Sequence, residues 1–128
     1  MQTTRPTSQD ALKRTETHAL IAADKVEGTA VYDAQGEKMG SIHRLMIDKM
    51  TGKVDYAVMS FGGFLGIGDR YHPLPWGMLT YDDGLEGYVV NLSKDKLKNA
   101  PSYAEKELAW QDPRFGVTVT DYYGPFLH

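Results

Sequence analysis

The sequence contains no cysteine among its 128 residues. Disulfide bonds, thiolate zinc sites and cysteine nucleophiles are therefore excluded for this chain. Long apolar runs are also missing, because no segment approaches the roughly 18 to 20 consecutive apolar residues of a membrane-spanning helix. The first residues, Met1–Pro6, lack the apolar stretch of a signal peptide, so we expect a cytoplasmic protein.

Basic residues are outnumbered as well. The chain has 14 lysines and arginines against 17 aspartates and glutamates, which gives a formal net charge of −3. Nucleic-acid backbones are bound by clustered basic surfaces, so this balance argues against a nucleic-acid partner.

Patterns typical of catalytic and metal sites are scarce. No histidine has a metal-like spacing to another histidine or to a carboxylate; the histidines are His18, His43, His72 and His128. The turn Asp82-Asp83-Gly84 lacks the alternating ligands and the closing glutamate of a calcium loop. No serine lies in a nucleophile-elbow setting. We therefore expect no catalytic residue, no metal site and no cofactor.

Three regions can be distinguished along the chain. Residues 1–16 are polar and predict a flexible tail. Residues 17–101 form the domain, in which five or six short strands at hairpin spacing predict a mainly β fold, a small antiparallel barrel with short C-terminal helices. The strand patterns lie at residues 19–22, 26–32, 39–48, 54–61, 71–75 and 87–92. Residues 102–128 form an extension that we expect to pack on the barrel or on a partner protomer.

Turn residues set the strand boundaries. Asp33–Gly36 and Thr51-Gly52 are turn sequences, with glycine where a positive φ is needed. The alternation of residues 39–48 is out of phase around His43-Arg44, which predicts a bulge. Residues 54–61 are apolar on both faces, which predicts a strand that is covered on both sides.

Helix signals gather after residue 92. Ser93 is a good N-cap for a helix over 94–98, which Pro101 would end. Ser102 and Glu105 match a capping box and predict a second helix over 103–110. For residues 113–123 two interpretations are open. Capping at Asp112-Pro113 and Gly124-Pro125 favours a helix with Phe115, Val119 and Tyr122 on one face, whereas the β-branched alternation of 117–120 favours a strand. We favour the helix.

The segment Ser60–Trp76 combines four glycines with large apolar residues. A nucleotide-binding loop would need a helix after the glycines, and the sequence His72–Pro75 cannot start one. The loop is therefore a wide hairpin turn whose apolar side chains either close one end of the barrel or contact a partner.

Four groups of residues follow one another in a recognisable order. They are Gly28–Asp33 with Gly36–Ile42, Met46–Lys49 with Thr51–Val54, Phe61–Gly68 with Pro73–Trp76, and Leu92–Leu97 with Ala100-Pro101. In order and spacing these motifs resemble the PRC-barrel family, over about residues 19–103. The tail Asp121–Gly124 also resembles stand-alone bacterial members.

The resemblance implies a small, mostly antiparallel barrel that works by contacting other proteins. The family takes its name from the cytoplasmic domain of the photosynthetic reaction-centre H subunit, and a related domain occurs in a ribosome maturation factor that binds the small subunit. The transmembrane helix of the former and the additional N-terminal domain of the latter have no counterpart in this sequence, so neither function is transferred.

We therefore expect a non-enzymatic protein-interaction and assembly module that forms a dimer or a higher homo-oligomer. The candidate contact residues are Phe64, Leu65, Ile67, Trp76, Tyr122 and Tyr123. Two alternatives stay open. A ribosome- or RNA-associated protein would need a basic patch made of Lys38, Arg44, Lys49 and Lys53, and a small-ligand-binding barrel would need a deep polar cavity.

Overall fold

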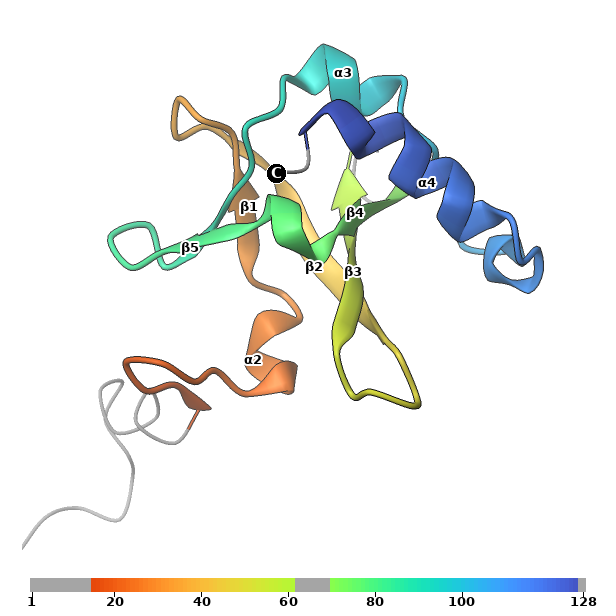
Figure 1. The fold of residues 1–128 in the computed structure, drawn as a ribbon. Helices are drawn as coiled ribbons and strands as arrows, with labels where there is room; N and C mark the ends of the chain where they lie inside the picture. The colour runs from red at the N-terminus through yellow and green to blue at the C-terminus, as the bar shows by residue number, and fades with distance from the viewer. Residues whose placement is uncertain (1–14, 62–69, 127–128) are drawn as a thin grey trace, which may run out of the picture.

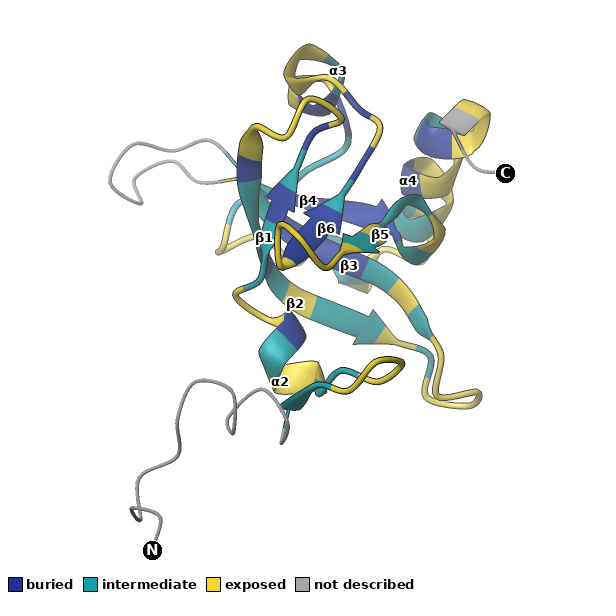
Figure 2. Ribbon diagram, turned by 90° about the vertical axis from the view of Figure 1, so that its left-hand side faces the viewer, coloured by how far each residue is buried: buried dark blue, intermediate teal, exposed yellow. Residues whose placement is uncertain are grey.

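The computed structural model describes residues 15–61 and 70–126. Six strands form one sheet in the order β4-β3-β2-β1-β6-β5 (Figures 1 and 2). The strands are β1 (Ala30–Tyr32), β2 (Lys38–Ile47), β3 (Val54–Phe61), β4 (Arg70–Pro75), β5 (Thr80–Asp82) and β6 (Gly87–Val89). The α-helices are α2 (Ala23–Val26), α3 (Lys94–Lys98) and α4 (Phe115–Tyr123), and short 3-10 helices are η1 (Trp76–Met78), η2 (Ala109–Gln111) and η3 (Gly124–Phe126).

The sheet is mixed and open, which corrects part of the predicted fold. A mainly β fold is confirmed, but β1 and β6 pair in parallel and the described strands do not close into a barrel. Gly87 explains how these two strands approach each other, since a Cβ there would lie only 2.7 Å from the Ala30 carbonyl oxygen. The parallel pair joins two antiparallel units, β1–β4 and β5–β6. The sequence patterns predict strands at β2, β3, β4 and β6, whereas the strand β5 was missed.

The central hairpin follows the predicted turn chemistry. The Asp48 carboxylate accepts hydrogen bonds from the backbone N–H groups of Met50 (2.8 Å) and Thr51 (2.9 Å), and Gly52 has a φ of +78°. These amides, that of Thr51 foremost, hold the pKa of Asp48 below its usual range. The predicted bulge is confirmed, because the register of β2 against β3 shifts between Ile42 and Arg44.

The region before β1 differs from its prediction. Residues 19–22 form no strand of their own, and Ile21 makes only an isolated bridge to Glu16. The predicted strand 26–32 is replaced by helix α2 and the shorter strand β1. Short apolar runs of this kind fit a helix as well as a strand, and tertiary packing decides between them.

Burial is deepest in the middle of the sheet (Figure 2). In β3, Ala57, Val58 and Met59 are all fully buried, which confirms that this strand is covered on both faces. Ala57 and Met59 belong to the main core, which also includes Val31 and Val90. Helix α4 contributes Val119 and Tyr123 to the same core, so the C-terminal helix is part of this packing.

The C-terminal region confirms two predicted helices and removes a third. The Ser93 hydroxyl accepts a hydrogen bond from the Lys96 N–H (3.0 Å) and caps α3 as predicted. The predicted helix over 103–110 is wrong. Tyr103 instead forms a bridge with Tyr71 of β4, an extended contact that a helix cannot make. Residues 115–123 are helical, which decides against the strand interpretation.

Candidate functional site

A groove of about 440 Å³ lies between strand β2 and the segment that follows Pro101. We call it the C-terminal groove. Its walls include Arg44, Met46, Tyr103, Glu105, Leu108 and Trp110. The sheet supplies one wall and an irregular segment the other, so the groove exists only because residues 102–111 cross this face of the sheet.

Strand-like hydrogen bonds hold the irregular wall in place. Tyr71 and Tyr103 exchange both backbone hydrogen bonds, with N···O distances of 2.8 and 3.0 Å. Next to this bridge, the Arg70 guanidinium donates to the hydroxyl and the carbonyl of Ser102 at 3.1 and 3.3 Å. The edge of β4 is therefore occupied by the chain's own C-terminal segment, which protects it from pairing with other strands.

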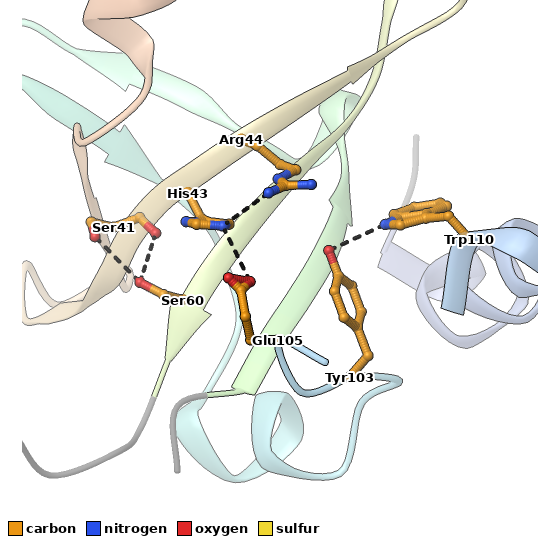
Figure 3. A network of polar contacts seen from close by, with 7 residues as sticks. All are labelled: Ser41, His43, Arg44, Ser60, Tyr103, Glu105 and Trp110. Carbon is orange, nitrogen blue, oxygen red and sulfur yellow. Dashed lines mark hydrogen bonds and ion pairs between the residues drawn. The ribbon is translucent and has the colours of Figure 1, made fainter. Parts of the chain in front are cut away.

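Two aromatic rings, Tyr103 and Trp110, line the groove, and further rings pack against these two. His43 stacks on Tyr71 with ring centroids 4.4 Å apart. Trp110 packs against Tyr56 at 5.3 Å and against Phe115 at 5.0 Å, and its indole N–H donates to the Tyr103 hydroxyl at 3.2 Å (Figure 3). Rings joined edge to face in this way form a rigid surface.

Charges of both signs line the groove. His43 Nε2 lies 3.4 Å from Arg44 Nη2 and 4.0 Å from the Glu105 carboxylate (Figure 3). Glu107 accepts a hydrogen bond from the Ala104 N–H at 2.6 Å. The side chains of Arg44, Glu105 and Glu107 are exposed, so they are available to a partner at low desolvation cost.

One apolar side chain projects at the lip of the groove. Leu108 follows the charged residues 105–107 and is 77% exposed, which is unusual for a leucine side chain. A leucine beside a concave, aromatic-lined surface is typical of an interaction site. Sequence analysis missed this residue, because the predicted helix over 103–110 would have made Leu108 one position of an amphipathic turn.

None of the six candidate contact residues singled out from the sequence is among the described residues that line the C-terminal groove. Phe64, Leu65 and Ile67 lie outside the described residues. Trp76 and Tyr122 are half-buried, and the Tyr122 hydroxyl donates to the Lys96 carbonyl at 2.7 Å. Tyr123 is fully buried, so its side chain packs inside this chain. A role of these residues in binding a partner stays a prediction.

The buried titratable groups do not form a reactive site with the groove. His72 is buried on β4, and this burial, with the nearby Arg70 charge, lowers its pKa to about 4. Its ring packs edge-on against Phe61 at 5.5 Å. Within residues 15–61 and 70–126, no three histidines or carboxylates come together as a metal-binding group, and no helix is long and apolar enough to cross a membrane.

The match to a family model extends over the sheet but not over the C-terminal helix. The family model named PRC-barrel domain matches residues 19–97. An uncharacterized protein of Deinococcus radiodurans is 28% identical over 76 residues, which cover 59% of this chain and 27% of that protein. The chain thus spans about a quarter of the length of this curated relative.

Among solved structures, one similar protein is described as a 16S ribosomal RNA processing protein, RimM, from Pseudomonas aeruginosa. It matches with a TM-score of 0.38 and 22% identity, over 57% of this chain and 44% of that one. The motifs around the glycine-rich loop, the bulged central hairpin and the family match over residues 19–97 together show that the chain belongs to the PRC-barrel domain family.

Proposed function

We propose that this protein is a non-enzymatic interaction module that associates with a second copy of itself through the C-terminal groove. The observation that carries the proposal is the exposed Leu108 at the lip of that groove. A two-fold symmetric contact brings the same surface of both copies together. A surface with a projecting apolar side chain and an adjacent hollow satisfies this requirement, because each Leu108 enters the groove of the other copy.

The charges of the groove support the same arrangement. Arg44 lines the groove together with Glu105 and Glu107, so positive and negative groups lie on one surface. In a symmetric contact the arginine of each copy faces the carboxylates of the other. Opposed charges of this kind favour the correct register and disfavour other partners.

The basic surface required for ribosomal RNA binding has weaker support. Lys38 begins strand β2 and Lys49 follows its end, so about 30 Å of extended strand separates them. Lys38 also follows an acidic residue, Glu37, whose carboxylate lies 3.9 Å from Lys94 Nζ. This carboxylate reduces the positive charge at the Lys38 end of the strand. We therefore rank the protein partner above nucleic acid.

Sedimentation equilibrium over a dilution series tests the proposal. The full chain is expected to dissociate reversibly from dimer to monomer. Leu108→Ser removes one apolar side chain from each half of the contact, so the dimer loses about 3 kcal/mol or more and its dissociation constant rises at least about 100-fold.

Met50→Ser is the matched control, since Met50 is 93% exposed in the β2–β3 turn and does not line the groove. This variant should dimerise like the wild type. A wild-type protein that stays monomeric at all concentrations would refute the proposal, as would equal weakening by the two substitutions.

A further inference from the structure

A second hollow, which we call the aromatic cavity, has a volume of about 290 Å³. It lies between residues 16–21, η1 and the β5–β6 hairpin. No described residue lines both this cavity and the C-terminal groove, so the two hollows are separate. Its size is at the low end for ligand sites and suits one small chemical group.

Three aromatic rings form a corner of this cavity. Trp76 meets Tyr88 at a centroid distance of 5.6 Å and an interplanar angle of 61°, and Tyr81 meets Tyr88 at 5.1 Å and 70°. Neighbouring rings at steep angles to one another form walls that face different directions. All three rings line the cavity, and an aromatic ring face carries the negative electrostatic potential that attracts a cation.

The polar lining adds negative charge. Glu16 and Asp83 line the cavity, and Glu86 lines an adjoining hollow that shares both of these carboxylates. No lysine or arginine is among the described residues that line either hollow. His18 also lines the cavity, and Lys25 Nζ lies 3.9 Å from Glu16 Oε1, at the long limit of an ion pair.

The two tyrosines respond to this environment. Burial, and after it the Glu16 carboxylate that accepts a hydrogen bond from Tyr81, raise the pKa of Tyr81 to about 12. Tyr88 lines the cavity with only 4% of its surface exposed. Burial, with the charge of Glu16, also raises the pKa of Tyr88, so both rings stay neutral at physiological pH.

We propose that the aromatic cavity binds an organic cation, namely an alkylated ammonium group. Aromatic walls and a few carboxylates suit a large, weakly hydrated cation, which loses little hydration on entering. A divalent metal ion needs a full shell of oxygen or nitrogen ligands instead, and the described residues contain no such group here. The ammonium group belongs either to a small molecule or to a methylated lysine side chain, and the chemistry of recognition is the same.

Titration with tetramethylammonium chloride, followed by NMR of the aromatic ring signals, tests the proposal on the full chain. We expect saturable shifts of the Trp76, Tyr81 and Tyr88 signals, with Trp110 as the internal reference. Sodium chloride at the same concentration controls for ionic strength, and tert-butanol, which has a similar shape and no charge, controls for apolar binding. Neither control should produce saturable shifts of these three residues.

Variants that keep the rings and remove the charge sharpen the test. Glu16→Gln combined with Asp83→Asn should raise the dissociation constant of tetramethylammonium about tenfold or more. Asp95→Asn is the matched control, because Asp95 is an exposed carboxylate in α3 outside the cavity. Equal responses to tetramethylammonium and tert-butanol would overturn the proposal, as would wild-type affinity in the double variant.

The source of the cation is resolved by comparing free trimethyllysine with a short peptide that contains it. Tighter binding of the peptide identifies a protein partner, and equal binding identifies a small molecule; saturable binding of either one supports the site. Leu108→Ser should leave these titrations unchanged. Failure of the cation site is therefore distinguishable from failure of the dimer contact.

Discussion

The two segments that flank the sheet differ in how they are attached to it. The C-terminal segment, residues 102–126, places the fully buried Val119 and Tyr123 in the main core and pairs Tyr103 with Tyr71 of β4. The N-terminal segment, residues 15–22, has no fully buried residue. It is held by hydrogen bonds within itself, such as Thr17 N–H to the Leu20 carbonyl at 2.6 Å, and by the contacts of Glu16 with Lys25 and Tyr81. Its Leu20 is 73% exposed.

This difference shows that the boundary of a family match is not the boundary of a core. The match ends at residue 97, yet the C-terminal segment fills the core beside the sheet. The N-terminal segment contributes little apolar burial and is expected to open locally, whereas α4 should unfold only with the sheet. The three predictions below test this contrast.

The largest expected effect is at Tyr123. Tyr123→Ala leaves a cavity in the core and should lower the free energy of unfolding by about 3–5 kcal/mol, whereas Leu20→Ala should change it by less than about 0.5 kcal/mol. Urea denaturation of both variants measures the contrast. Tyr123→Phe is the control, because the Tyr123 hydroxyl is buried without a hydrogen-bond partner among the described residues, and its removal should cost nothing. Similar losses in Tyr123→Ala and Leu20→Ala would contradict the contrast.

Acid should weaken the C-terminal side of the sheet through His72. Burial lowers the pKa of His72 to about 4 in the folded state, against 6.5 in the unfolded chain. Between these values the unfolded chain binds more protons, so the stability present above pH 6.5 is lost as the pH falls towards 4. At pH 5 the expected loss is about 2 kcal/mol relative to pH 7.

Urea denaturation at pH 7 and pH 5 measures this effect. His72→Leu replaces the imidazole with an apolar side chain of similar size that does not titrate. The loss of unfolding free energy between pH 7 and pH 5 should therefore be smaller in this variant by about 2 kcal/mol. His18→Gln, at an exposed position of the N-terminal segment, is the matched control substitution. An unchanged pH dependence in His72→Leu would exclude this histidine as the cause.

The smallest effect concerns the contact between the sheet and α4. The Tyr56 hydroxyl donates to the Gly116 carbonyl at 3.2 Å and lies 3.2 Å from the Thr120 hydroxyl. Tyr56→Phe removes both contacts and should lower the free energy of unfolding by about 1 kcal/mol. Thr120→Val removes only the second contact and should cost less. Amide hydrogen exchange in α4 is the second measurement. If the exchange rates in Tyr56→Phe equal those of the wild type, packing alone holds the helix on the sheet.

Local signals were sufficient for much of the fold. The Asp48 and Gly52 turn, the bulge at His43 and the Ser93 cap each depend on a few neighbouring residues, and all were predictable from sequence. Helix α4 was predictable from its flanking prolines and glycine. On the predicted face Val119 is fully buried, while Phe115 and Tyr122 pack half-buried against the core; the burial of Tyr123 was not predicted.

Features that depend on distant residues were not predictable in this way. The parallel pairing of β1 with β6 has no local signature, and the extended path of Tyr103 is set by its bridge to Tyr71. The two hollows were missed for the same reason. Leu108 and Arg44 line one hollow, and Glu16 and Tyr88 line the other, only after the sheet has formed.

The parallel pairing of β1 and β6 also has a kinetic consequence. Val31 lies opposite Tyr88, so the pairing closes a long loop of chain, whereas the β2–β3 and β5–β6 pairs close short ones. Loop closure costs entropy before the contacts compensate for it, so the hairpins should form first and the parallel pair last. The protein is thus expected to fold on the millisecond-to-second timescale of domains whose contacts join residues distant in sequence. The joining of the two antiparallel units, β1–β4 and β5–β6, should set that rate.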